Sequence, residues 1–167
     1  MANQTAALKN YHRETLERSI EINASGESIW KALLNEENFK TWASVFKTDS
    51  RVETDWKLGS EVKFTDSHGN GIIGKVMEHD PGQELSIRFE RLLKNGQEDL
   101  ESDKAKKWLG ATENFYLNEG QSKSILTVEE EVPVERQAEL ESKWDLALRK
   151  VKEISESLEG GMEARSA

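Results

Sequence analysis

The sequence predicts a single α+β domain in which a curved antiparallel sheet wraps around a long C-terminal helix. Turn residues divide 51–132 into short segments of alternating apolar residues, a pattern typical of antiparallel hairpins. Residues 138–158 carry an apolar stripe at helical spacing. Two shorter helical patterns precede the hairpins. We therefore expect the order strand, two helices, five or six strands, helix over 11–159, between disordered tails at 1–10 and 160–167.

The first strand and the two short helices follow from local patterns. Leu16, Ile20 and Ile22 share one face of a strand predicted over 14–23. Ser25 then fits the N-cap of a helix, because its hydroxyl can accept a hydrogen bond from a free backbone N–H. The positions that we expect these helices to bury are Ile29, Trp30, Leu33 and Leu34 in the first and Phe39, Trp42, Ala43 and Phe46 in the second.

Turn residues mark predicted hairpins at residues 67–71, 80–82, 95–96 and 118–120. With a two-residue turn at Pro81-Gly82, the opposed pairs are Leu85 with Glu78, Ile87 with Val76, and Phe89 with Gly74. With a two-residue turn at Glu119-Gly120, the opposed pairs are Phe115 with Ser124, Glu113 with Leu126, Ala111 with Val128, and Leu109 with Glu130. Both registers place mostly apolar residues on one face of the sheet.

Two segments of the central region need more than a simple hairpin. Val62 and Phe64 join the apolar face only if the loop after their strand has three or five residues, or if a bulge lies there. Residues 97–107 are too charged for a half-buried strand. We predict a long loop or a short helix there, between strands at 84–93 and 108–117.

The final helix has the clearest pattern in the sequence. We expect it to end at Gly160-Gly161, which suits the C-cap position of a helix. Glu139 with Lys143 and Asp145 with Arg149 have the spacing of ion pairs on its exposed side. Its apolar stripe comprises Ala138, Leu140, Trp144, Ala147, Leu148, Val151, Ile154 and Leu158.

Composition and charge argue against several classes of function. The net charge of −9 disfavours nucleic acid binding, because contacts with phosphates need clustered Lys and Arg. There is no Cys, which excludes a disulfide, a thiolate metal site and a Cys nucleophile. No apolar run approaches the ~18 residues of a membrane span, and the first ten residues lack the apolar stretch of a signal peptide. We expect a soluble, cytoplasmic protein.

No motif predicts a metal, a cofactor or a catalytic nucleophile. His12 lies beside the N-terminal tail, and His68 and His79 lie at opposite ends of one predicted strand, about 25 Å apart at 3.3 Å per residue. Asp66 before His68 and Asp80 after His79 are typical turn residues. No Ser can be tied to a His and a carboxylate.

Several short motifs, taken in order, resemble the START-like superfamily, also called SRPBCC or birch-pollen-allergen-like, with its helix-grip fold. These motifs lie at residues 20–34, at Phe39-Lys-Thr-Trp42, at Trp56-Lys-Leu-Gly-Ser60 and around Trp144. More narrowly, the chain is similar to stand-alone bacterial relatives of the C-terminal domain of the heat-shock-protein-90 ATPase activator. The resemblance covers about 14–159, and departs from the family at Ser25, where relatives often have Pro.

The resemblance implies a cavity between the sheet and the C-terminal helix that holds an apolar molecule. On this basis we expect a ligand to contact aromatic side chains near the ends of the elements, together with one carboxylate. The expected ligand-binding residues are Trp42, Phe46, Trp56, Phe64, Phe89, Trp108, Glu113, Phe115, Trp144 and Leu148.

Three charged residues fall on the apolar face by the alternation of their strands. Glu113 and Glu130 do so in the last hairpin, and Arg91 follows Leu85, Ile87 and Phe89 in an earlier strand. A carboxylate in a cavity wall costs free energy unless it is paired, and desolvation raises its pKa. Two interpretations stay open. Glu113, with Arg91, fixes a polar ligand group or acts as an acid–base; or these residues reach solvent or form structural pairs.

Three functions are compatible with the sequence. The leading hypothesis is binding of an apolar or amphipathic small molecule in a preformed cavity. The first alternative, from the family resemblance, is a co-chaperone or protein-interaction domain with a chaperone partner. The second is an enzyme of the cyclase or hydratase kind, which uses the same cavity with Glu113 as acid–base.

Overall fold

The computed structural model describes the backbone of residues 11–166 and the side chains of 11–161. The predicted tail at 1–10 lies outside the described residues. The elements are β1 (Arg13–Ile22), α2 (Gly26–Leu34), α3 (Glu36–Ala43), β2 (Arg51–Glu53), β3 (Glu61–Thr65), β4 (Gly71–Asp80), β5 (Glu84–Lys94), β6 (Gln97–Asp99), α4 (Asp103–Trp108), β7 (Thr112–Glu119), β8 (Ser124–Pro133), the 3-10 turn η1 (Val134–Arg136) and α5 (Gln137–Ser166). The predicted α+β class is confirmed, with seven strands rather than five or six after the two helices.

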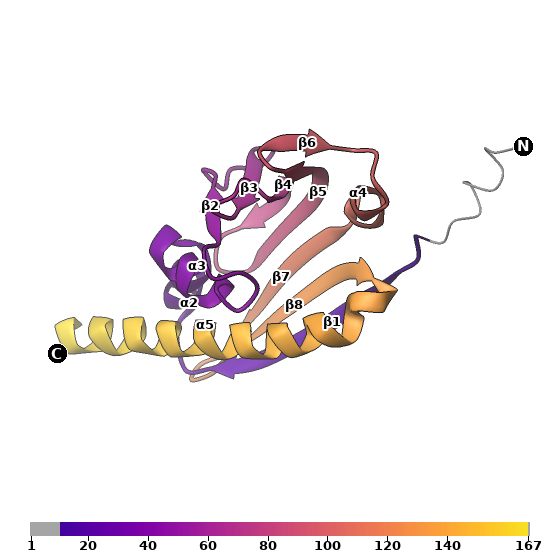
Figure 1. Ribbon diagram of the computed structural model, residues 1–167. Helices are drawn as coiled ribbons and strands as arrows, with labels where there is room; N and C mark the ends of the chain where they lie inside the picture. The colour runs from indigo at the N-terminus through magenta and orange to yellow at the C-terminus, as the bar shows by residue number, and fades with distance from the viewer. Residues whose placement is uncertain (1–10, 167) are drawn as a thin grey trace, which may run out of the picture.

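The strands form one antiparallel sheet in the order β1-β8-β7-β5-β4-β3-β2, and the short β6 pairs with β5. Figure 1 shows this sheet curving over α5, with α2 and α3 at one end and α4 at the other. α5 packs against β1, α2 and α3. The long helix therefore lies within the curve of the sheet, as the apolar stripe predicted.

Capping side chains determine where the two short helices begin. Ser25 is the N-cap of α2 and accepts a hydrogen bond from the backbone N–H of Ser28, as predicted. Asn35 ends α2 and also caps α3, so the two helices meet at one residue. The hydroxyl of Ser28 donates to Glu159 of α5 at 2.5 Å, and the hydroxyl of Ser25 donates to the same carboxylate at 2.9 Å. These bonds attach the start of α2 to the far part of α5.

α5 continues beyond its predicted end. Its helical backbone runs through Gly160 and Gly161 to Ser166, so the predicted end of the helix at Gly160-Gly161 is wrong. Neither glycine has the positive φ of a glycine that ends a helix. The neighbouring residues are mostly good helix formers, and a glycine costs only about 1 kcal/mol relative to Ala.

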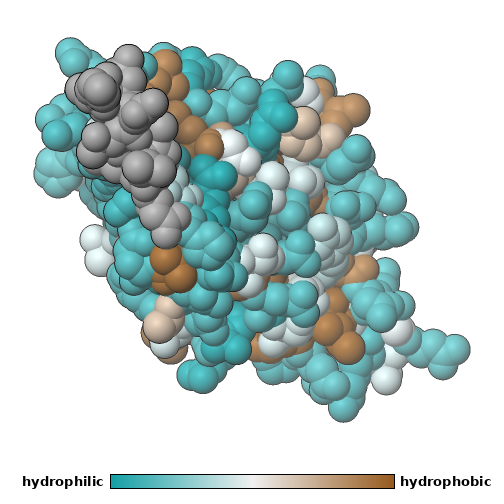
Figure 2. Space-filling view, turned by 90° about the vertical axis from the view of Figure 1, so that its right-hand side faces the viewer, coloured by the Kyte–Doolittle hydropathy of each residue, from teal (hydrophilic) through white to brown (hydrophobic). Residues whose placement is uncertain are grey.

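The apolar stripe of α5 supplies one side of the core. Leu140, Trp144, Ala147, Leu148 and Val151 are all buried, and the remaining apolar positions toward the C-terminus are partly buried. On the face shown in Figure 2, hydrophilic residues predominate and hydrophobic residues form small separate groups. Large apolar side chains are thus concentrated inside the curve of the sheet.

The β4–β5 hairpin has the predicted faces but a longer turn. Asp80 pairs with Glu84, so three residues form the loop, and Leu85 pairs with His79 instead of Glu78. An irregularity between Val76 and Glu78 then restores the predicted pairs Val76 with Ile87 and Gly74 with Phe89. A bulge adds one residue to one strand, and therefore it compensates for the odd loop length.

The other two hairpins decide which residues face the interior. Thr65 pairs with Gly71 across a five-residue loop, one of the two loop lengths predicted to bring Val62 and Phe64 onto the apolar face. The β7–β8 loop has four residues instead of two, because Glu119 pairs with Ser124. This difference leaves each residue on its predicted face but changes its partner. Glu113 pairs with Glu130, and the predicted pair of Glu113 with Leu126 is wrong.

A second irregularity removes Arg91 from the interior. Gly74 pairs with Phe89, but Ile73 pairs with Arg91, so β5 has one extra residue at Glu90. The alternation of β5 reverses at this point, and Arg91 forms ion pairs with Glu61 and Glu98. The expectation that Arg91 shares the cavity face with Glu113 is therefore wrong.

Candidate functional site

A cavity of about 670 Å³ lies between the sheet, α3, α4 and the first turns of α5. Seven aromatic rings contribute to its wall. The ring-bearing residues of the wall are Phe39, Trp42, Phe46, Phe64, Phe89, Trp108 and Trp144. A space of this size is within the 300–1,000 Å³ range of small-molecule pockets.

The cavity brings together seven of the ten residues expected to contact a ligand. These are Trp42, Phe46, Phe64, Phe89, Trp108, Glu113 and Trp144. Trp56 and Phe115 border a separate void of about 10 Å³. Leu148 is buried one turn beyond Trp144 and borders neither space. The alternation of a strand or helix places a residue inside the fold, but it does not distinguish a cavity wall from solid packing.

Trp144 of α5 is the central ring of the wall. Its ring centroid lies 4.9 Å from that of Phe46 and 5.8 Å from those of Trp42 and Phe115. The contacts with Phe46 and Phe115 are edge-to-face, an arrangement favoured by the charge distribution of aromatic rings. These contacts fix the ring of Trp144 and direct its indole N–H toward Glu130, 3.4 Å away.

Two carboxyl groups lie together in the wall beneath Trp144. Glu113 of β7 and Glu130 of β8 are direct cross-strand partners, and both border the cavity. Two carboxylates side by side in a buried wall repel each other, so the pair is expected to keep one proton between its two groups. Glu130 is only 6% exposed, whereas Glu113 is half-buried because its side chain faces the cavity. We call Glu113 and Glu130 the carboxyl pair.

Burial makes the carboxyl pair hard to ionise. Desolvation, then the charge of Glu130 and the hydrogen bond with it, raise the pKa of Glu113 well above its usual range. Desolvation also raises the pKa of Glu130, but the hydrogen bonds from Glu113 and Trp144 and the charge of Arg136 oppose this effect. The negative charge is therefore best held on Glu130, while Glu113 keeps the proton.

The entrance of the cavity carries mostly positive charge. Asp66 and Asp99 are the acidic residues there, apart from the carboxyl pair. We call the basic residues that border the cavity the basic mouth: Lys47, Arg51, Lys94, Lys104, Arg136 and Lys143. Arg136 also lies over the ring of Trp108, 5.9 Å from its centroid. This arrangement contrasts with the net charge of −9 of the whole chain.

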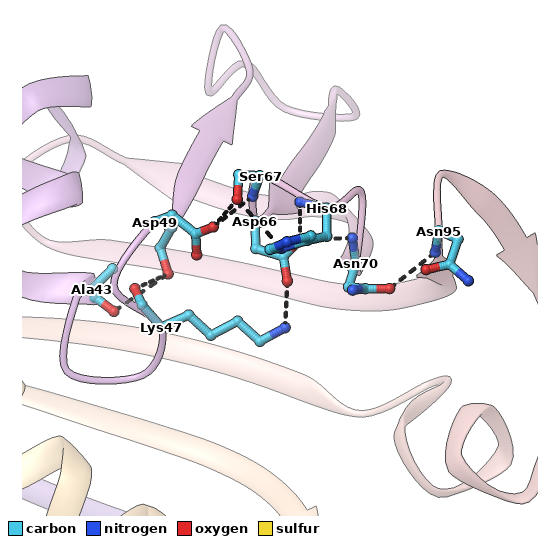
Figure 3. A network of polar contacts seen from close by, with 9 residues as sticks. Ala43, Lys47, Asp49, Asp66, Ser67, His68, Asn70 and Asn95 are labelled. Atoms are coloured by element: carbon cyan, nitrogen blue, oxygen red, sulfur yellow. Dashed lines mark hydrogen bonds and ion pairs between the residues drawn. The ribbon is translucent and has the colours of Figure 1, made fainter.

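A polar network fixes one side of the mouth (Figure 3). Lys47 donates to Asp66 at 2.8 Å, and the backbone N–H groups of His68 and Asn70 donate to the other oxygen of Asp66. The hydrogen bond from Lys47 and those from the backbone hold the pKa of Asp66 far below its usual range. Asp66 is thus a turn residue, as predicted, and it also joins the α3–β2 segment to the β3–β4 loop.

Two further contacts extend this network. Asp49, close to Lys47 in sequence, accepts hydrogen bonds from the backbone and the hydroxyl of Ser67. The side chain of Asn70 accepts from the backbone N–H of Asn95 at 2.9 Å, which connects the β3–β4 loop to the β5–β6 turn (Figure 3). Three loops at the mouth are therefore held together by hydrogen bonds.

His79 has a structural environment outside the cavity. Its Nε2 accepts a hydrogen bond from the indole N–H of Trp30 at 2.9 Å, and its Nδ1 lies 2.8 Å from the carbonyl oxygen of Trp56. Since an indole N–H can only donate, the neutral tautomer with the proton on Nδ1 satisfies both partners. His79 joins α2 to the segment before β3, and the description of this residue as an ordinary turn residue is incomplete.

Sequence reasoning missed two features of this site. Alternation along the strand placed Glu130 on the correct face but could not identify it as the partner of Glu113. A four-residue loop and a two-residue loop leave the same residues on that face and change only which residues are opposite each other. It also missed the basic mouth, whose members come from the α3–β2 segment, β2, β5, α4, η1 and α5 and have no common spacing. The run of Lys104 to Lys107 was the one local signal, and only Lys104 borders the cavity.

Comparison with known proteins yields one family and many similar folds. The family model described as "Activator of Hsp90 ATPase homolog 1-like protein" matches residues 23–156. None of the curated proteins matches the chain. Within residues 11–166, no helix is long and apolar enough to cross a membrane.

Three solved structures illustrate the similarity of fold. Protein MLL2253 from Mesorhizobium loti has a TM-score of 0.67 and 14% identity, over 84% of this chain and 96% of that chain. The Aha1 dimer from Colwellia psychrerythraea has a TM-score of 0.65 and 20% identity, over 86% and 96%. CalU16 from Micromonospora echinospora has a TM-score of 0.57 and 13% identity, over 86% and 85%. At such identities the likeness concerns the fold alone.

Proposed function

The chain belongs to the family of Activator of Hsp90 ATPase homolog 1-like proteins, and we propose that it binds an apolar or amphipathic small molecule in the cavity beneath α5. The observation that carries this proposal is the cavity of about 670 Å³, walled by seven aromatic rings and one carboxyl pair. Small-molecule sites combine such an apolar wall with a few placed polar groups. Burial of ligand surface would contribute roughly 25 cal/mol per Å².

Two features of the wall support binding rather than simple packing. The rings that border the cavity are held by one another and by hydrogen bonds, as when the indole N–H of Trp42 donates to the carbonyl oxygen of Leu33 at 3.1 Å. The network around Asp66 holds three mouth loops together. A site formed in advance loses less conformational entropy when a ligand binds.

A filled-cavity variant tests the proposal. Ile72 of β4 borders the cavity, so Ile72→Trp would place a large ring in it, whereas Ile125→Trp adds the same ring at an exposed position of β8. We expect the dye 1-anilinonaphthalene-8-sulfonate to bind the wild type and Ile125→Trp alike. It should bind Ile72→Trp at least about tenfold more weakly, a difference of about 1.4 kcal/mol. Equal dye affinity for two cooperatively unfolding variants would contradict binding in this cavity.

The carboxyl pair favours a second candidate function, acid–base catalysis of the cyclase or hydratase kind. A protonated Glu113 beside an ionised Glu130 offers a proton donor and an acceptor to the same bound molecule. The test is turnover of an identified substrate by Glu113→Gln, which keeps the shape of the side chain but removes the acidic proton. Full turnover by this variant would exclude the catalytic role and leave binding intact.

A further inference from the structure

The cavity has polar groups of opposite charge at two levels of burial. The basic mouth is solvent-exposed: the side chain of Lys47 is 53% exposed and that of Lys143 is 32% exposed. The carboxyl pair lies in the buried wall, where Glu130 is 6% exposed. Between these groups the wall is aromatic and aliphatic. A ligand that satisfies all three regions has an anionic end, an apolar body and one polar group.

Part of the basic mouth forms no ion pair with the residues that the structure describes. Lys47 pairs with Asp66, and Arg136 and Lys143 both pair with Glu139. Among residues 11–161, the other three members, Arg51, Lys94 and Lys104, form no ion pair within 4 Å. Positive charge gathered at the entrance of an otherwise acidic protein raises the local concentration of anions. The mouth therefore favours a negatively charged ligand group.

The hydrogen-bond inventory of the carboxyl pair selects the polar group. Because Glu113 and Glu130 are direct cross-strand partners in the wall, a proton on the pair is shared between them, and Glu130 also accepts from the indole N–H of Trp144. A carboxylate has about four acceptor sites, so Glu130 retains free lone pairs, as does the carbonyl oxygen of Glu113. The pair thus offers acceptors to the cavity, and its one proton reaches a ligand only by leaving its place between the two carboxyl groups. A ligand hydroxyl can donate to it, whereas a ligand ketone can bind only if the internal bond breaks.

We propose that the ligand of this cavity is an amphipathic anion with a hydroxyl group on its apolar body. The basic mouth binds the anionic end, and the carboxyl pair accepts a hydrogen bond from the hydroxyl. This inference rests on the proposed function, since it names the class of molecule that the same cavity takes.

A panel of twelve-carbon probes separates the three recognition features. It contains dodecanoate, neutral dodecanol, and sets of hydroxydodecanoates and oxododecanoates in which the hydroxyl or ketone oxygen lies at different carbon atoms of the chain. Binding is measured by the change in tryptophan fluorescence, because Trp42, Trp108 and Trp144 border the cavity. We expect at least one hydroxy isomer to bind about fivefold more tightly than dodecanoate, the effect of one net hydrogen bond, and no oxo isomer to do so.

Variants of the carboxyl pair assign this preference to its residues. In Glu113→Leu/Glu130→Leu, we expect dodecanoate to bind as before and the hydroxyl preference to disappear. If that variant does not fold, Glu113→Gln/Glu130→Gln serves instead, and its amide N–H donors should remove the discrimination between hydroxy and oxo isomers. Glu129→Gln is the matched control, because Glu129 precedes Glu130 on β8 and faces the opposite side of the sheet.

A second set of variants tests the anionic end. The triple variant Arg51→Gln/Lys94→Gln/Lys104→Gln should weaken dodecanoate about tenfold at low salt and leave dodecanol unchanged. The effect should shrink at 0.5 M salt, where screening shortens the range of charges. The matched control, Lys57→Gln/Lys63→Gln/Lys123→Gln, makes the same change in net charge at three residues outside the cavity.

The outcomes distinguish this inference from the proposed function. Binding of dodecanoate without any gain from a hydroxyl, an equal gain from ketones, or a gain that persists without the carboxyl pair would each overturn the role of the pair. Equal binding of dodecanoate and dodecanol would overturn the role of the mouth. If the dye binds in the cavity but no member of the panel does, the ligand class is wrong while the proposed function stands. If neither binds, both are wrong.

Discussion

Two glutamates that face each other across neighbouring strands are unusual inside a protein, because like charges in a low-dielectric environment repel. Here the cost is reduced by a shared proton, by the indole N–H of Trp144 and by the charge of Arg136. The structure shows that the residue opposite Glu113 is Glu130. Sequence alternation placed both carboxyls inside, but only the length of the β7–β8 loop could make them neighbours.

The raised pKa of Glu113 leads to a pH-dependent prediction. A carboxyl whose pKa is higher in the folded state binds more protons there, so the wild type loses stability as pH rises above the usual value near 4.5. Glu113→Gln has no proton to lose at this site. We expect the stability of this variant relative to the wild type to increase with pH. Its free energy of unfolding should exceed that of the wild type by about 1 kcal/mol at pH 8 and by less at pH 5.

Urea unfolding at pH 5 and pH 8 measures this difference. Glu129→Gln is again the control, since the side chain of Glu129 faces away from the cavity. The difference in free energy of unfolding between this variant and the wild type should not change with pH. If Glu113→Gln and the wild type differ in free energy of unfolding by the same amount at both pH values, ionisation of the carboxyl pair costs no stability and the prediction is wrong.

Asp66 gives the opposite pH dependence. The hydrogen bonds from Lys47 and from the backbone lower its pKa in the folded state, so it stabilises the protein above the usual value of 3.8 and this stabilisation is lost as pH falls. Asp66→Asn should therefore be less stable than the wild type at pH 7 by about 2 kcal/mol, with the gap narrowing below pH 3.8. Asp80→Asn, at the end of β4, is the control. Thermal unfolding across this pH range that left the gap constant would contradict the role of the charge.

At the scale of elements, α5 shows how far local patterns determine the fold. Leu148 is 1% exposed in the buried stripe, whereas Leu146 of the same helix is 50% exposed. Leu148→Ala should cost about 2–5 kcal/mol in free energy of unfolding, because it removes buried methyl groups and leaves a cavity. Leu146→Ala should change it by less than about 0.5 kcal/mol. Chemical denaturation of the two variants provides the comparison, and equal losses would mean that α5 does not dock through this face.

The predicted ion pairs of α5 illustrate the limits of such patterns. Glu139 and Lys143 form their expected pair at 3.2 Å. Asp145 instead pairs with Arg18 of β1 at 3.3 Å and not with Arg149. The spacing along a helix identifies possible partners on that helix, but it contains no information about a strand that packs beside it. Tertiary contact decided the outcome here.

The strands show the same division between local and non-local information. The alternation of residues along the strands correctly predicted which face of the sheet is occupied by Val62, Phe64, Phe89 and Phe115. It could not predict the extra residue at Glu90, because a bulge exchanges backbone hydrogen bonds without requiring a distinctive side chain. The sequence therefore predicts the elements and most of their faces, whereas the cross-strand partners depend on loop lengths and bulges.

For the whole molecule, the principal feature is the separation of charge and apolar surface. The chain carries a net charge of −9, yet the entrance of its cavity is basic, and its aromatic rings gather in the wall. The presence of an interior rich in aromatics could be predicted from the sequence. The cavity itself could not be predicted, because its volume depends on how closely the side chains of α3, α5 and the sheet pack against one another.

The tryptophan indoles offer the most direct test of the central claim, that the space beneath α5 is a ligand site. Trp42, Trp108 and Trp144 border the cavity, whereas Trp30 lies outside it and donates to His79. In a ¹⁵N-labelled sample titrated with 1-anilinonaphthalene-8-sulfonate, we expect the indole N–H resonances of the three cavity tryptophans to shift in a saturable manner, while that of Trp30 stays in place. A saturable shift of Trp30 alone, or no shift of the three at saturating dye, would contradict the account.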